Sequence, residues 1–337
     1  MVPSYKYLTP EQIDFFMTHG YVVIKKALKE EWITRATQDI WIRLGFDPID
    51  KSTWTQERIH QPWHRRVLAK DVAPSAWGAI CELVGGEERI SDRCKEWRDN
   101  MIINLGAKRW ETEDIRPQDL DNWHCDGDFF LHFLDSPEQG LLTIPLYSDI
   151  KPRGGGTYIA EDSIGVIARW LRDHPEGIMP GMGTGDGRFD FGARLKECKV
   201  FTEMTGERGD VILLHPLMLH SASKNHTRSI RFITNPPVSL KEPFNFNRSD
   251  SSQFSLVERK TLKELGVEKL DFSLKAPRKN IIPQRLDVQS RILAEELKRM
   301  REYAEKYGAE VDSVHKDVPE DKLKESLTPS VVRVGDA

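Results

Sequence analysis

The strongest constraint on the fold is a series of short apolar runs between residues 100 and 237, separated by glycine and proline. The runs are MIINL, LLTIPLYSDI, GTYIA, GDVILLHP and SIRFITN. Runs of this length with such boundaries are typical of β-strands. Many short strands at irregular spacing favour a β-barrel or β-sandwich over a parallel α/β sheet.

Helical patterns lie on both sides of this β-rich region. Thr9 fits an N-cap, with Pro10 at the first helical position and Gln12 three residues after the cap, and Gly20 ends the helix. We expect further elements as a strand at 21–24 and helices around 32–44, 76–84 and 286–307. The last helix has an apolar stripe, which predicts a packing or dimer contact rather than a catalytic role.

The composition narrows the classes of function. The chain of 337 residues carries 49 basic and 53 acidic side chains, so no net field draws it to nucleic acid or to an anionic membrane. The first residues lack the pattern of a signal peptide, and no apolar run is long enough to span a bilayer. The four cysteines form no CxxC pair, which fits a reducing compartment. We expect a cytoplasmic protein with a small-molecule partner.

Two potential metal ligands stand close together in the segment NWHCDGDFF. His124 and Asp126 are separated by one residue, so an extended backbone turns both side chains to the same face and Cys125 to the other. His220 follows the strand-like run GDVILLHP and is the candidate for a third ligand, brought in from another strand. A lone HxD motif is weak evidence, but the distal histidine behind a strand, together with Arg231 eleven residues later, makes a metal site the better interpretation.

The donor types indicate which metal chemistry to expect. Two histidines and one carboxylate on one face of an octahedral ion leave open positions, an arrangement that suits Fe(II) oxygenases. These positions can hold 2-oxoglutarate and dioxygen, and the far carboxylate of 2-oxoglutarate needs a cation such as a guanidinium. Arg231 and Arg228 compete for this role. Alternation along SIRFITN favours Arg231, because Arg228 lies in the preceding turn.

Other polar residues receive a plainer interpretation. Asp128 shares the face of Asp126, but a further ligand from one short segment would crowd the ion, so a supporting or loop role is expected. His215 is interpreted as a strand-end histidine bonded to backbone. Three more histidines are interpreted as ordinary surface or boundary residues with no assigned role: His60, His64 and His132.

Four segments resemble the phytanoyl-CoA dioxygenase-like family of Fe(II)/2-oxoglutarate-dependent oxygenases. They are LTPEQIDFFMTHGYVVIKKAL, WHCDGD, GGGTYIAEDS and GDVILLHPLMLHSASKNHTRSIRF, and they occur in the family's order between about residues 8 and 237. The last segment is the most specific, because it reproduces the spacing from the second histidine ligand to the arginine. A glycine-rich insertion at 175–196, which is either a lid or a surface decoration, and the tail after 250 have no clear counterpart.

The resemblance implies a double-stranded β-helix, or jelly-roll, core with flanking helices. It implies that His124, Asp126 and His220 hold Fe(II), that Arg231 binds 2-oxoglutarate, and that Thr157 is a second contact to this co-substrate. The oxygenase domain would comprise residues 1–250, and residues 251–337 would form a helical extension and charged tail.

The implied reaction is oxidation of an unactivated carbon of a small molecule by dioxygen, with hydroxylation as the default and desaturation or cyclisation as variants. A metabolite of specialised metabolism is the expected substrate, and a monomer or homodimer the expected state. Two alternatives remain open. One is a zinc-type metal-dependent hydrolase, and the other is a non-catalytic binding relative of the same fold.

Overall fold

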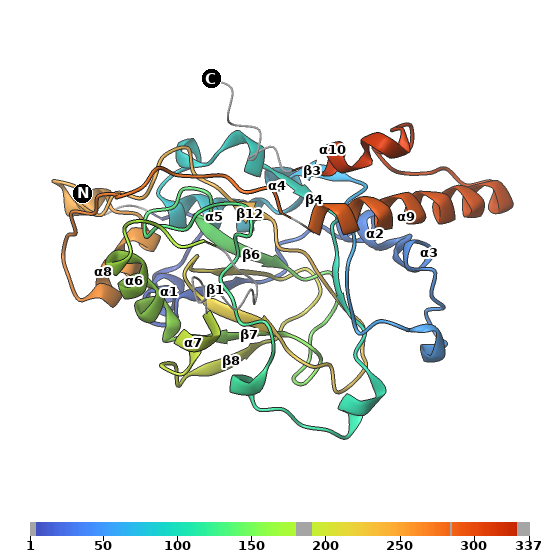
Figure 1. The fold of residues 1–337 in the computed structure, drawn as a ribbon, viewed down its shortest axis with the longest axis horizontal. Coiled ribbons are helices and arrows are strands. Elements are labelled where there is room, and N and C mark those ends of the chain that lie inside the picture. Colours follow the sequence, from blue (N-terminus) through green and yellow to red (C-terminus); the bar gives the residue numbers. More distant parts are fainter. Residues whose placement is uncertain (1–4, 180–190, 284, 329–337) are drawn as a thin grey trace.

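The computed structural model describes residues 5–179, 191–283 and 285–328 (Figure 1). Half of the glycine-rich insertion, at 180–190, therefore lies outside the described residues. Its interpretation as a lid or a surface decoration stays a hypothesis.

The larger of two antiparallel layers combines strands from most of the chain. Its strands are β1 (Tyr21–Ile24), β9 (Val211–Leu214), β6 (Leu141–Pro145), β12 (Pro237–Val238), β11 (Arg231–Ile233), β5 (Ile102–Asn104) and β2 (Arg58–His60). Ile233 pairs with Leu146 in the same register in which Pro237 pairs with Leu142. Strands β11 and β12 are therefore two parts of one interrupted strand along the edge of β6, and this strand joins β5 and β2 to the layer.

The smaller layer carries two of the candidate ligands. It contains β10 (Leu219–Ala222), β7 (Thr157–Ala160) and β8 (Phe201–Met204) in that order. A bridge between His124 and His220 adds the segment around His124 beside β10. Figure 1 shows β1 and β6 above β7 and β8.

The order of crossings between the layers defines the fold. From β5 to β11 the chain passes to the His124 segment, back to β6, across to β7 and β8, back to β9, across to β10 and back to β11. This pattern of eight strands in two layers is that of a double-sheet jelly roll. The predicted jelly-roll core is confirmed, and within the described residues it is built of open sheets rather than one closed barrel.

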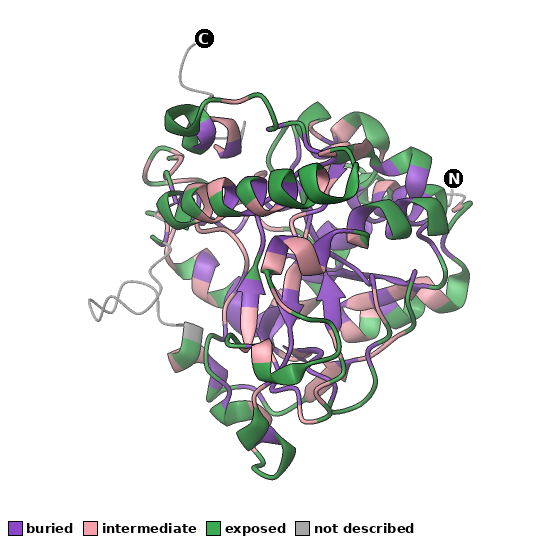
Figure 2. Cartoon of the chain, turned by 90° about the vertical axis from the view of Figure 1, so that its right-hand side faces the viewer, coloured by how far each residue is buried: buried purple, intermediate pink, exposed green. Residues whose placement is uncertain are grey.

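Burial explains why the central strands read as uninterrupted apolar sequence. Every residue of β6 and of β9 is buried, because one face packs on the other layer and the opposite face is covered by helices and loops. Figure 2 shows the strands as the buried centre of the molecule, while the helices expose their outer faces.

The flanking helices follow the predicted pattern in outline. They are α1 (Pro10–His19), α2 (Glu30–Thr37), α3 (Ile40–Leu44), α4 (Ala69–Val72), α5 (Pro74–Val84), α6 (Ser163–Asp173), α7 (Phe191–Leu195), α8 (Leu256–Leu265), α9 (Arg285–Tyr307) and α10 (Leu323–Leu327), with a strand pair β3 (Arg66–Leu68) and β4 (Glu96–Arg98). Thr9 and Gln12 form the predicted capping box of α1, and Gly20 ends it at φ 77°. The helix predicted at 32–44 is divided into α2 and α3.

The segment after residue 250 packs on two sides of the core. Helix α8 lies against α1, α5 and α6, and α9 lies against α3 and α10. The predicted apolar stripe of α9 is buried at Leu293, Leu297 and Met300. Among the described residues, none of the helices combines the length and the apolar character that crossing a membrane requires.

Candidate metal centre

Backbone pairing brings the first and third candidate ligands together. The N–H of His124 donates to the carbonyl of His220 at 3.0 Å, and the N–H of His220 donates to the carbonyl of His124 at 2.9 Å. In an antiparallel pair such opposed residues place their side chains on the same face. Their ring centroids are 4.3 Å apart.

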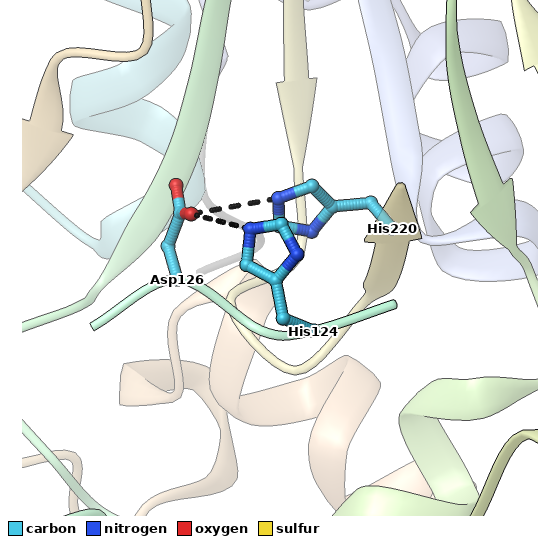
Figure 3. Close-up of side chains that lie close together, drawn as sticks. All are labelled: His124, Asp126 and His220. Carbon is cyan, nitrogen blue, oxygen red and sulfur yellow. Dashed lines mark ion pairs between the residues drawn. The ribbon is translucent and has the colours of Figure 1, made fainter. Parts of the chain in front are cut away.

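Asp126 completes a compact group of three donors. Its Oδ1 lies 3.3 Å from Nε2 of His124 and 3.5 Å from Nε2 of His220. Figure 3 shows the carboxylate facing both rings. Ligands about 2.1 Å from one ion and at right angles to one another lie about 3 Å apart. The spacing thus fits three ligands on one face of a single metal ion, and the structure brings together all three predicted residues.

The outer nitrogen of each imidazole is held by the backbone. Nδ1 of His124 lies 2.7 Å from the carbonyl of Asn122, and Nδ1 of His220 lies 3.1 Å from that of Met218. A carbonyl can only accept, so Nδ1 carries a proton, and Nε2 is the nitrogen that remains to bind a metal ion when the ring is neutral. Such support fixes the ring orientation that metal binding needs.

Asn235 is a further supporting residue that the sequence analysis did not single out. Its Nδ2 donates to Oδ2 of Asp126 at 3.2 Å, which leaves Oδ1 directed at the histidines. The available signal was parity, because Asn235 follows Arg231 by four residues in SIRFITN and thus falls on the same side of an extended run.

The electrostatics of the site reflect its buried charge. Burial alone would raise the pKa of Asp126, but hydrogen bonds and the charges of His124 and His220 hold it well below its usual range. Burial likewise opposes protonation of His124, and the neighbouring Asp126 carboxylate outweighs it, so the pKa of His124 is raised. A carboxylate that stays ionised beside two imidazoles is suited to bind a divalent cation.

Arg231 is buried without a carboxylate partner. Its side chain is 1% exposed, and its Nε and Nη1 donate to the carbonyls of Gly155, at 2.7 Å, and Ile102, at 3.3 Å. Within the described part of the chain, none of the carboxylates lies within ion-pair distance of it. Burial, with a smaller effect of Arg58, lowers the pKa of Arg231 to about 9. A buried and uncompensated guanidinium is costly and calls for an anion.

The turn that accepts from Arg231 also leads to Thr157. Gly155 precedes Thr157 by two residues, and Thr157 is a buried residue at the start of β7, opposite Ala222 of β10. The structure therefore brings the GGGT turn to Arg231, as the two predicted co-substrate contacts require. The role of Thr157 stays a prediction.

Arg228 is engaged elsewhere. It has a left-handed backbone at φ 50°, its guanidinium lies over the Trp54 ring at 5.5 Å, and its Nη1 is 3.7 Å from Glu111. The alternation argument that favoured Arg231 is consistent with this placement, because Arg231 points into the core and Arg228 does not belong to β11.

The remaining histidines and Asp128 have other partners. Asp128 binds Arg285 through both oxygens, and His215 bonds Thr261 Oγ1 at 2.9 Å. The expectation that His64 and His132 are surface or boundary residues is wrong, because both are buried, and His64 contacts Glu296. His60 is solvent-accessible. The surrounding protein nevertheless desolvates its ring, and this desolvation, together with the positive charge of Arg231, lowers the pKa of His60 to about 4.

Comparison with known proteins gives likenesses at the level of structure. No protein-family model and no curated protein sequence matches the chain. The resemblance to the phytanoyl-CoA dioxygenase-like family therefore stays a prediction.

Among solved structures, one match is the non-heme alpha ketoglutarate dependent carbocyclase SnoK from nogalamycin biosynthesis, at 18% identity over 69% of this chain and 84% of that chain, with a TM-score of 0.38. HygX from Streptomyces hygroscopicus, solved with nickel, 2-oxoglutarate and hygromycin B, matches at 12% identity over 69% and 88%, with a TM-score of 0.38. EctD from S. alaskensis, solved with 2-oxoglutarate and 5-hydroxyectoine, matches at 13% identity over 72% and 81%, with a TM-score of 0.40.

Proposed function

We propose that this chain is a non-haem Fe(II)- and 2-oxoglutarate-dependent oxygenase of the phytanoyl-CoA dioxygenase-like kind. The observation that carries the proposal is the buried guanidinium of Arg231, which lacks a carboxylate partner in the described structure. The converging donors of His124, Asp126 and His220 supply the metal site. A dicarboxylate that chelates the ion through its 2-oxo acid end needs a cation for its far carboxylate.

Each residue of the site has a role in this proposal. His124 and His220 would hold the ion through Nε2, and Asp126 through Oδ1, with Asn235 fixing the other carboxylate oxygen. Arg231 would orient 2-oxoglutarate, and Thr157 would contact it as well. When bound, Fe(II) and 2-oxoglutarate together supply the reduction of dioxygen that oxidises an unactivated carbon of the substrate, with succinate and carbon dioxide as by-products.

The proposed substrate is a small molecule of specialised metabolism, in line with the sequence expectation. The proposed domain division is an oxygenase domain at 1–250 with a helical extension at 251–337. The four free cysteines, three of them buried, fit a reducing compartment, and we propose the cytoplasm. A monomer or homodimer is the proposed state.

The hydrolase alternative uses the same three ligands. A zinc ion held by two histidines and a carboxylate can activate water. A hydrolase of this kind does not require a buried cation at the position of Arg231. The oxygenase function explains both the three metal ligands and the buried guanidinium. The non-catalytic alternative leaves both the converging donors and Arg231 without a purpose.

The deciding experiment is an anaerobic titration of the apoprotein with Fe(II) and then with 2-oxoglutarate. We expect the weak visible metal-to-ligand charge-transfer band of a chelated 2-oxo acid, and its loss in His220→Ala. His174→Ala is the matched control, because His174 bonds the carbonyl of Trp170 and contacts none of the three candidate ligands. Bound Fe(II) without the band in the wild-type protein would contradict the proposal and favour a hydrolytic metal site.

A further inference from the structure

A small cavity adjoins the segment that carries two of the candidate metal ligands. Its volume is about 20 Å³, and its wall includes Cys125 and Asp126. About 10–15 Å³ is enough for one water-sized molecule, so the cavity has room for a ligand of one or two heavy atoms.

Most of the cavity wall is apolar. The apolar side chains come from the loop after Asp126, from α6, from the turn before β10 and from the loop after β12, and they are Phe130, Phe133, Leu134, Ile167, Leu171, Pro216, Leu217 and Phe244. Three of these are aromatic rings and five are aliphatic side chains, and none of the eight has a hydrogen-bonding group. A cavity with such a wall favours an apolar occupant.

The polar residues of the wall are bonded within the protein. Ser136 Oγ accepts from the N–H of Phe133 at 2.8 Å, and Gln139 Nε2 donates to the carbonyl of Leu141 at 3.3 Å. His132 Nε2 lies 2.7 Å from the carbonyl of Gly127, and burial lowers the pKa of His132 to about 4, so the ring is neutral. Asp126, the charged residue of the wall, has Oδ2 bonded to Asn235 and Oδ1 beside the two imidazoles. A buried water needs two to four polar partners, and these polar groups are already engaged within the protein.

The wall beside Asp126 is also tightly built. The rings of Phe130 and His132 stack at 4.2 Å, and Gly127 packs against them. A Cβ on Gly127 would lie 2.3 Å from Phe130, and its φ of +125° excludes most other residues. The cavity is therefore a pre-formed space between rigid groups rather than a gap that side chains close.

From these observations we infer that the cavity is a binding site for dioxygen beside the metal centre. Dioxygen is a small apolar gas, it fits the volume, and it gains from leaving water for a mostly apolar space. The inference rests on the proposed function, since the cavity reaches the segment of Asp126, whose carboxylate would hold the ion. The apolar residues of the cavity wall would raise the local concentration of dioxygen beside the proposed metal ion.

The first test uses the wild-type apoprotein and needs no activity. Dissolved dioxygen is paramagnetic, so it enhances the nuclear relaxation of methyl groups that it contacts. We expect the strongest enhancement among buried methyl groups at Leu134, Ile167, Leu171 and Leu217, with Leu83 of α5 as a buried reference. Xenon under pressure in crystals of the full chain should occupy the same space. Enhancement no greater than at Leu83, or an ordered water in the cavity, would overturn the inference.

The second test fills the cavity. Leu171→Phe adds a ring from the wall on α6, and Val166→Phe is the control, because Val166 is on the same helix but does not line the cavity. We expect Leu171→Phe to lose the relaxation enhancement and to raise the Michaelis constant for dioxygen several-fold, with Fe(II) binding and the charge-transfer band unchanged. An unchanged constant for dioxygen in a folded Leu171→Phe would overturn the inference. Absence of the band in wild-type protein would instead overturn the proposed function.

Discussion

The candidate ligands depend on neighbours that bind no metal themselves. Asn235 holds Oδ2 of Asp126, and backbone carbonyls of Asn122 and Met218 hold the two rings. Because each of these contacts acts on one atom of a ligand, the effect of removing it can be measured separately from loss of the ligand. Asn235 offers the cleanest case, since it acts through a side chain.

Asn235→Ala should weaken Fe(II) binding while leaving the protein folded. The loss of one supporting hydrogen bond to a ligand lowers metal affinity by about 10- to 100-fold in comparable sites. The measurement is a competitive Fe(II) titration under anaerobic conditions. Asn247→Ala is the control, because Asn247 is exposed and distant in sequence from the ligands. Equal affinities in the two variants would show that Asn235 does not position Asp126.

Arg231 should act on the co-substrate rather than on the metal. Loss of a charge-assisted contact of about 1.5–3 kcal/mol predicts that Arg231→Ala raises the Michaelis constant for 2-oxoglutarate by about 10- to 100-fold. Arg231→Lys should recover part of this, because an ammonium keeps the charge but not the planar fork. Arg228→Ala should leave the constant unchanged. If Arg228→Ala has the larger effect, the two roles are exchanged.

The sequence was informative about these residues to different degrees. The one-residue separation of His124 and Asp126 and the alternation around Arg231 depend on local backbone geometry, which sequence patterns report directly. Asn235 and the carbonyl of Gly155 act across strands that are far apart in the chain. Such contacts are fixed by register and loop shape, so the sequence alone did not identify them.

At the level of elements, α9 contributes a buried charge to the N-terminal helices. Glu296 Oε2 lies 2.9 Å from Nε of Arg43 and 2.9 Å from Nε2 of His64, and all three side chains are buried. Arg43 also binds Asp99 at 3.2 Å. The apolar stripe of α9 was predicted from its spacing, but this ion pair was not, because its partners are separated by most of the chain.

Removing Glu296 should destabilise the protein. Glu296→Ala leaves the buried Arg43 with one acid fewer, and breaking a buried ion pair costs about 3–5 kcal/mol in comparable cases. Glu295→Ala is the matched control on the same helix, because Glu295 is exposed and 3.7 Å from Arg299. Its cost should stay within about 0.5 kcal/mol. Urea unfolding measures both free energies, and similar costs would contradict the role given to the buried pair.

The same carboxyl predicts a pH dependence. Burial raises the pKa of Glu296 from 4.5 to about 7, although Arg43 opposes this. Between these values the folded chain retains a proton that the unfolded chain releases. The stability that this difference in protonation contributes is thus fully present below pH 4.5 and is lost as the pH rises through about 7.

Glu296→Gln tests this dependence, because it keeps the shape but does not titrate. Burial lowers the pKa of His64 to about 3, so its ring stays neutral in the folded wild-type protein over this range. The free energy of unfolding of the wild type should fall relative to that of the variant between pH 4.5 and about 7. Unfolding curves at intervals of pH supply the comparison, and a constant difference across this range would disprove the shift.

For the whole molecule, the question is whether the segment after 250 behaves as a separate unit. The resemblance to a known family predicted the jelly-roll core, but it offered no counterpart for this segment. No sequence pattern within the segment shows where it packs. In the structure, Leu131 donates to the carbonyl of Lys279, and Ile281 donates to that of Phe129, so a C-terminal strand-like piece pairs with the loop that follows Asp126. Arg285 binds Asp128 in the same loop.

These contacts predict that core and extension unfold together. The extension supplies Glu296 to the buried Arg43, and it pairs with the loop beside the candidate metal ligands. It therefore cannot detach from the core without exposing buried charge to solvent. Calorimetry of the full chain should give one transition, with equal calorimetric and van 't Hoff enthalpies. Saturating Fe(II) should move this whole transition upward, because binding to the folded state stabilises everything that unfolds with the site. Two transitions, of which Fe(II) shifts only one, would show that the C-terminal segment is an independent unit attached to the jelly-roll core.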